Sequence, residues 1–160
     1  MVDTRQILRS WNDLAEAVVT TARAATKSLV IFTHNLDPQV FNQQEFLDEI
    51  KRLATTNRTA KVRILCMDST YAMQDSHRLI ETSRRLSSFV EIRAVGDDFR
   101  DREDAFIIAD RRAIVHRTHA GRPDGFVDTN SVADASRLLT QFNHIWEYSS
   151  AEREFQRLHI

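Results

Sequence analysis

Apolar residues recur along the chain at two kinds of spacing, one typical of helices and one typical of buried strands. Residues 4–27 place apolar side chains three or four positions apart, which predicts an amphipathic helix with Asp3 or Thr4 as its N-cap. Residues 29–32 are a short continuous apolar run, the pattern of a strand that is covered on both faces. The chain is therefore predicted to begin with a helix followed by a buried strand.

The alternation continues to the end of the chain. A second helix is predicted from Asn42, where Glu45 stands at capping-box spacing, a third from Ser76, and a last long helix from Asn130 or Ser131. Apolar runs predict further strands at residues 62–66, 89–95, 105–109, 113–116 and 125–127. This order predicts an α/β fold, a layered sheet of about six or seven mixed strands with helices on both faces.

Composition is typical of a globular protein. The 160 residues are 42% hydrophobic and 28% charged, which is enough to bury a core, and we expect one domain over residues 1–160. With three glycines and two prolines, no linker is expected to divide the chain.

Charge and cysteine content narrow the environment and the partners. The formal net charge is -1 and the pI about 6.6, so nucleic acid is not an expected partner. No apolar run approaches the roughly 20 residues of a membrane span, and the first residues lack a secretory signal, so no membrane contact is expected. Cys66 is the single cysteine, which excludes an internal disulfide and favours a cytoplasmic location.

Residues 103–120 follow the spacing H-x-K-x4-D-x6-G-S-x-N. Only Asp110 keeps its residue type, and Thr118 stands at the serine position. The histidine, lysine, glycine and asparagine positions hold other residues, which are Glu103, Ala105, Arg117 and Ala120. This degenerate frame resembles the signature of the phospholipase D superfamily, and the predicted element order is similar to one half of such an enzyme.

The resemblance implies how the site would differ from an active one. In that family the histidine attacks phosphorus, and the lysine and asparagine neutralise the phosphoryl oxygens. A carboxylate about 4 Å from a phosphate repels it by roughly 4 kcal/mol at an effective dielectric of about 20, so Glu103 without a lysine at Ala105 opposes binding. We therefore expect no catalytic residue. Because the family pairs two halves, a homodimer is expected.

Polar residues follow several predicted strands at the edge where α/β sheets hold ligands. These residues predict a module that binds a small anionic ligand or a protein partner. The candidate binding residues are His34, Asp68, Ser76, His77, Arg78, Glu103 and Arg117. Each could equally be a cap or a solvated side chain. Arg117 could bind an anion, or it could pair with Glu103 or Asp110 and close the pocket.

An enzyme remains the alternative: a divergent phosphodiesterase or nuclease that uses Glu103, His116 or His119. No metal or other cofactor is expected, because His116 and His119 have an odd spacing on a strand and no cysteine pair completes a ligand set. Cys66 lies in an apolar run and is expected in the core.

Overall fold

Eight strands form one mixed sheet in the computed structural model, which describes residues 4–74 and 77–151. The order across the sheet is β1-β7-β6-β5-β2-β3-β4-β8. The strands are β1 (Arg5–Leu8), β2 (Ser28–Thr33), β3 (Lys61–Cys66), β4 (Val90–Ala94), β5 (Ala105–Ala109), β6 (Ala113–Arg117), β7 (Gly125–Asp128) and β8 (Ser150–Ala151). The predicted α/β class with a mixed sheet is confirmed, and the short edge strands β1 and β8 are additional to the predicted ones.

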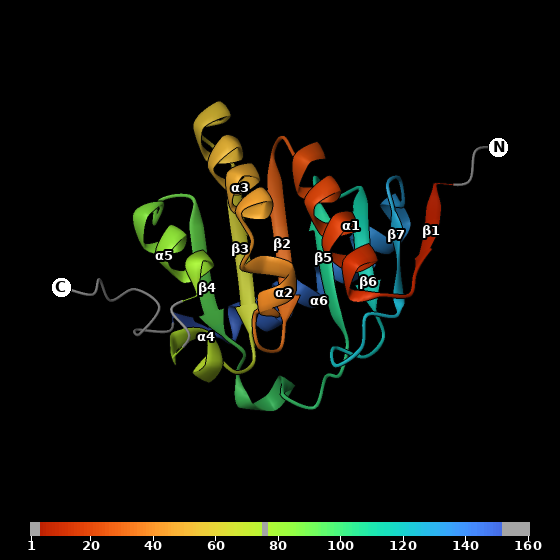
Figure 1. Ribbon diagram of the computed structural model, residues 1–160. Helices are drawn as coiled ribbons and strands as arrows, with labels where there is room; N and C mark the ends of the chain where they lie inside the picture. The colour runs from red at the N-terminus through yellow and green to blue at the C-terminus, as the bar shows by residue number, and fades with distance from the viewer. Residues whose placement is uncertain (1–3, 75–76, 152–160) are drawn as a thin grey trace.

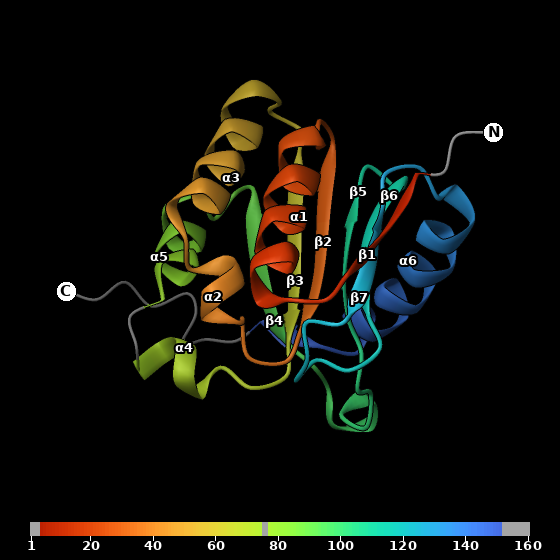
Figure 2. The same ribbon diagram turned by 45° about the vertical axis from the view of Figure 1, so that its right-hand side comes forward.

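Helices cover both faces of the sheet, as predicted (Figure 1). One face carries α1 (Trp11–Ala24), α2 (Pro38–Phe41), α3 (Gln44–Thr56) and α5 (Arg78–Arg85), and the other carries α6 (Val132–Glu147) (Figure 2). The short helices α4 (Thr70–Gln74) and η1 (Asp97–Phe99) follow β3 and β4. Among residues 4–74 and 77–151, no helix is long and apolar enough to cross a membrane.

The central strands are rich in apolar residues because they separate two hydrophobic cores. Ile31 and Ile64 pack toward α1 and α3, whereas their neighbours Phe32 and Leu65 pack toward α6. Successive side chains on a strand point to opposite faces, so a strand with a core on each side needs an unbroken apolar run. This explains the run that predicted β2, whereas in β3 the run is interrupted by Arg63.

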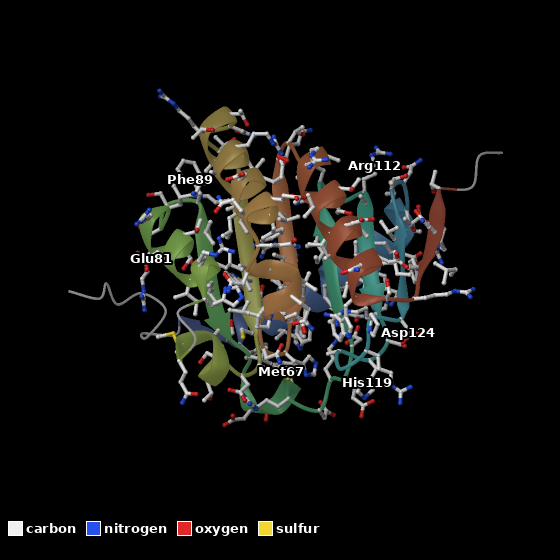
Figure 3. The ribbon with its side chains drawn as sticks, viewed as in Figure 1. Met67, Glu81, Phe89, Arg112, His119 and Asp124 are labelled. Atoms are coloured by element: carbon white, nitrogen blue, oxygen red, sulfur yellow. The ribbon has the colours of Figure 1, made fainter. Side chains whose placement is uncertain are left out.

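The strands β2, β3 and β4 are parallel, so their carboxyl ends meet at one edge of the sheet, called here the carboxyl edge. The antiparallel strand β5 begins at this edge and β6 ends there, because Ala105 and Arg117 are partners in register. Figure 3 shows Met67, His119 and Asp124 toward this edge, and Arg112, in the β5–β6 turn, at the opposite one.

The predicted helix over residues 4–27 is wrong in its first part. Residues 5–8 form β1, which pairs antiparallel with β7 more than a hundred residues later. The helix α1 begins only after Ser10, whose hydroxyl accepts a hydrogen bond from the Asp13 backbone N–H at 3.0 Å. Pairing with a distant strand leaves no local signal, and it overrides the weak helical spacing around Ile7.

The predicted helix start at Asn42 is also wrong. The chain forms α2, breaks at Asn42 and Gln43, and continues as α3, whose N-cap is Gln43. The Asn42 side chain does not cap α3, because its oxygen accepts hydrogen bonds from the Arg78 backbone N–H and side chain. A contact with α5 therefore replaces the expected capping box.

Candidate functional site

The signature-like frame is divided between the two ends of β5. Glu103 and Ala105 lie at the carboxyl edge, and Asp110 follows β5 at the opposite edge. Asp110 and the next residue, Arg111, adopt positive φ angles of 55° and 59° in the tight turn to β6. Glu103 and Asp110 are therefore separated by the length of β5 and cannot act on the same ligand atom.

Asp110 has a structural role in this turn. Its carboxylate accepts hydrogen bonds from the backbone N–H groups of Thr26, Lys27 and Ser28 at 2.9, 2.8 and 3.0 Å. Partial burial opposes ionisation of Asp110, but these backbone donors outweigh it and lower the pKa of the carboxyl. The one residue of the frame that keeps its type thus ties the β5–β6 turn to the start of β2.

Arg117 fills the space beside Ala105 on the face of the sheet that α1 and α2 cover. Its Nη2 donates to Asp37 Oδ2 at 2.6 Å, and its Nη1 donates to the backbone oxygens of Ala120 and Arg122. The Arg117 and Asp37 side chains are only 5% and 7% exposed. Arg117 was predicted either to bind an anion or to pair with Glu103 or Asp110, and in the structure it forms an ion pair with Asp37 instead.

Little space remains at this place. The cavity beside Ala105 and Arg117 has a volume of about 10 Å³ and is otherwise lined by apolar side chains of α1, α2, β2, β5 and β6. Such a volume holds at most about one water molecule, whereas small-molecule sites usually measure about 300–1,000 Å³. The frame is closed on this face.

The predicted cationic ligands are used to hold the loop between β2 and α2. His77 is buried, its Nε2 lies 2.8 Å from the Leu36 carbonyl oxygen, and its Nδ1 accepts from the Leu79 backbone N–H. Arg78 donates to the Asn42 side chain and backbone oxygen. Of the sequence-predicted residues, His77, Arg78 and Arg117 converge, and each binds a group of the chain's own 36–42 segment.

The held loop is conformationally unusual. Leu36 has a φ of 62° and is fully buried, although residues other than glycine rarely adopt this left-handed conformation. Thr33 Oγ1 accepts from the Leu36 backbone N–H at 3.1 Å, and Asn35 Oδ1 accepts from that of Asp37 at 3.0 Å. These local bonds, with the Arg117 and His77 contacts, offset the conformational cost of Leu36.

A second polar cluster lies on the α6 side of the same edge. His116 Nε2 is 2.9 Å from Asp104 Oδ2, and Arg102 donates to both oxygens of Asp104 at 2.5 and 3.0 Å. His34, the one predicted ligand on this side, has Nε2 3.2 Å from the Asp104 backbone oxygen. The rings of Phe32 and Phe106 stack beneath the cluster, with their centroids 5.3 Å apart.

Asp104 is the centre of this cluster and was not among the sequence candidates. Burial opposes its ionisation, but hydrogen bonds from His116 and Arg102 outweigh it and lower the pKa of Asp104 to about 2. A signal was present, because Asp104 precedes β5 by one residue and His116 faces Phe106 across the hairpin. The proximity of Asp104 and His116 can be inferred only once the register of the β5–β6 hairpin is known.

The remaining candidates do not join either group. Asp68 is exposed, and hydrogen bonds from Thr70 lower the pKa of its carboxyl as it caps the turn into α4. Glu103 is exposed, and its backbone oxygen accepts from Ala120 N–H at 2.8 Å. Thr118 is exposed. Ser76 lies outside the described residues, and the N-cap of α5 is His77.

Two further predictions concern the carboxyl edge: that Cys66 lies in the core, and that no metal ion is bound. Cys66 is buried at the end of β3, as expected. Within the part of the chain that the structure describes, no three His, Cys, Asp or Glu side chains are arranged to hold a metal ion. His116 is held by Asp104, and His119 Nδ1 instead accepts from the Gly121 backbone N–H.

The family comparison covers nearly the whole chain. The family model described as Domain of unknown function (DUF7931) matches residues 10–158. None of the curated proteins matches the sequence.

Solved structures with the same fold include two that align along almost their full length. Nuc, a phospholipase D family member from Salmonella typhimurium, has a TM-score of 0.68 at 12% identity, covering 92% of this chain and 97% of that one. NucT from Helicobacter pylori has a TM-score of 0.65 at 13% identity, with coverage of 92% and 97%. The fold is therefore phospholipase-D-like, as the sequence predicted.

A third structure shows the fold within a longer protein. TrmBL2, described as an archaeal chromatin protein with a novel mode of DNA binding, has a TM-score of 0.67 at 11% identity. The alignment covers 94% of this chain but only 54% of TrmBL2, so this chain spans about half of that protein. At these identities the likeness concerns the fold alone.

Proposed function

The chain belongs to the family described as a domain of unknown function (DUF7931), and from this premise we propose that it is a catalytically inactive phospholipase-D-like domain. In this proposal it acts by binding a small molecule or a partner protein, and it does so as a homodimer. A phosphodiester is not turned over.

The buried pair of Arg117 and Asp37 is the observation that carries the proposal. Arg117 is the register partner of Ala105, which stands at the position of the missing lysine. Its charge is already neutralised by Asp37 at 2.6 Å, and its other donors bond backbone oxygens. Binding a phosphate there would break a buried ion pair, which typically costs about 3–5 kcal/mol.

Charge at the carboxyl edge supports the same conclusion. Glu103 takes the place of the attacking histidine and is exposed. Asp104 beside it is ionised down to a pH of about 2. The Glu103 carboxylate repels an anionic substrate, and Arg102 does not compensate for it, because Arg102 is engaged by Asp104 through two hydrogen bonds.

A hydrolysis assay tests the proposal. The purified chain is incubated with bis-p-nitrophenyl phosphate, with and without divalent metal ions, and nitrophenolate release is followed. We expect no release above the buffer rate. Turnover that disappears in Glu103→Ala or His34→Ala would contradict the proposal, since contaminating activity would survive those changes.

One observation favours the alternative of a divergent phosphodiesterase. The His116 imidazole is held by the Asp104 carboxylate at 2.9 Å, an arrangement that orients an imidazole for nucleophilic or base catalysis. Its weakness is that the adjacent cation, Arg102, is already paired. The two proposals differ in one result: the alternative requires turnover that is lost in His116→Gln and kept in the control His144→Gln.

The proposed homodimer rests on the resemblance to a family that pairs its halves through the face bearing the signature. Sedimentation equilibrium should give twice the 18.5 kDa of the chain. Glu103→Arg, at an exposed position of that face, should weaken the association, while Glu45→Arg on α3 should not. A monomer at all concentrations would rule the dimer out.

A further inference from the structure

A second hollow lies on the α6 side of the sheet, the side away from the Arg117–Asp37 pair. It is a groove of about 380 Å³, within the usual range of small-molecule sites. Its walls come from the η1 loop and from the C-terminal half of α6, and the lining residues are Phe99, Asp101, Arg102, Gln141, His144 and Ile145. Figure 2 shows α6 on the side of the sheet opposite α1 and α3.

Aromatic rings form one side of the groove. The Phe99 ring centroid lies 5.4 Å from that of His144 and 6.1 Å from that of Tyr148. Gln141 and His144 are three residues apart on one face of α6. Tyr148 is the C-cap of α6, and its ring centroid lies 5.2 Å from that of His144. Tyr148 is 67% exposed, so part of this aromatic surface is open to a ligand.

The η1 loop, which contributes Phe99, Asp101 and Arg102 to the groove, is rich in acidic residues. Residues 97–104 include exposed carboxylates that form no ion pair within the described residues, and these are Asp97, Asp98, Asp101 and Glu103. The loop also contains two arginines. Arg102 is neutralised by Asp104, which leaves Arg100 as the one unpaired cation among residues 97–104. An aromatic surface beside acidic residues attracts a cation that has an apolar body.

We propose that this groove binds a small organic cation that carries a flat apolar ring. The ring lies against Phe99 and Tyr148, and the cationic group faces Asp101 and the η1 loop. This inference gives the proposed binding role a ligand class, so it rests on that role. It assigns the ligand to the α6 side, away from the signature-like frame.

The experiment uses three probes that differ only in the polar group. The full chain, labelled with ¹⁵N, is titrated with 2-phenylethylamine, 2-phenylethanol and 3-phenylpropionate, and amide shifts are followed. We expect the amine to bind with a Kd in the millimolar range, typical of so small a molecule, and more tightly than the alcohol. The propionate should bind most weakly, and shifts should concentrate in residues 97–102 and 141–148.

Matched variants separate the two contributions. Asp101→Asn should weaken the amine about two- to fivefold and leave the alcohol unchanged, since an exposed charge pair is worth little more. Tyr148→Ala should weaken both probes, because it removes ring contact. Glu45→Gln, an exposed carboxylate on α3, should change neither.

Several outcomes would overturn the inference. One is that no amide shifts appear at about 10 mM amine. Another is that the propionate binds as tightly as the amine, and a third is that the shifts fall in residues outside the groove. The inference and the proposed function fail separately, because phosphodiester turnover would refute inactivity without moving the amine titration. If the chain shows no phosphodiester turnover and does not bind the amine, only the proposed ligand class is refuted.

Discussion

Arg117 and Asp37, eighty residues apart in the chain, form a buried ion pair with Nη2 and Oδ2 at 2.6 Å. The pair joins the end of β6 to the loop after β2 and occupies the face beside Ala105. It explains why the signature-like frame is closed: the residue at the glycine position does not leave room for a ligand but fills that room itself. The pair also supports the strained loop at Leu36.

Removing one member of this pair should destabilise the fold. Arg117→Met leaves Asp37 buried without its partner, and we expect the free energy of unfolding to fall by about 3–5 kcal/mol. Arg117→Met combined with Asp37→Asn should recover at least half of that loss, because the uncompensated charge is gone. Urea denaturation of the wild type and of the single and double variants measures both values.

The matched control is Arg122→Met, since the Arg122 side chain is exposed and only its backbone oxygen contacts Arg117. It should change stability by less than about 0.5 kcal/mol. Equal losses in Arg117→Met and the double variant would show that the charge of Asp37 is not the cause.

Asp110 should matter for stability and not for chemistry. Asp110→Asn keeps a residue type that tolerates positive φ but loses the charge that three backbone N–H groups share, so we expect a loss of about 1–2 kcal/mol. Asp124→Asn, at an exposed position, is the control. Thermal or urea unfolding distinguishes the two, and equal stability of both variants would refute the structural role.

The Asp104 cluster predicts a loss of stability in acid. The folded pKa is about 2 against an ordinary 3.8, so the carboxylate stabilises the fold above pH 3.8 and this contribution disappears as the pH falls through 2. The depressed pKa corresponds to about 2 kcal/mol. Between pH 4 and pH 2, wild type should therefore lose about that much more stability than Asp104→Asn. Parallel curves in urea titrations at several pH values would contradict this.

His77 predicts a separate effect nearer neutral pH. Because Nδ1 accepts from the Leu79 N–H, the ring is neutral with its proton on Nε2, which donates to Leu36. Burial lowers the pKa of His77 below its ordinary 6.5. Its contribution is therefore complete above that value and declines as the pH falls toward the lower folded pKa.

The measurement compares wild type with His77→Gln. We expect wild type to be the more stable at pH 7, by about 1–3 kcal/mol for the lost buried hydrogen bonds, and the difference to shrink on acidification. His144→Gln, at an exposed position, is the control for the substitution itself and should change stability at pH 7 by less than about 0.5 kcal/mol. A constant difference between wild type and His77→Gln from pH 7 to pH 5 would be inconsistent with a neutral His77.

The predictions that held rest on local patterns. Continuous apolar runs predicted β2 and β5, because a strand between two cores must be apolar on both faces, and the mostly apolar residues 62–66 predicted β3. Ser131, expected near the start of the last helix, is the N-cap of α6. The phospholipase-D-like fold followed from the order of these elements and from the spacing of residues 103–120.

The predictions that failed concern distant contacts. Residues 5–8 are a strand only because β7 offers its edge, and Asn42 ends α2 because Arg78 binds its side chain. For Arg117, the sequence left an anion site and an ion pair open, and it did not point to Asp37 as a partner. Asp37 lies in the loop after β2, and no spacing along the chain indicates that it is close to Arg117.

The sequence by itself determined the central alternation of strands and helices. It also determined that residues 103–120 lack the histidine and the lysine of the signature that they resemble. The tertiary structure decided what the replacements do. It turned Arg117 and His77 inward onto one loop, brought Asp104, His116 and Arg102 together across a hairpin, and opened a groove beside α6. The physical reason is that hydrogen bonding, charge pairing and burial depend on neighbours in space, whereas sequence periodicity records only which face of its own element a residue occupies.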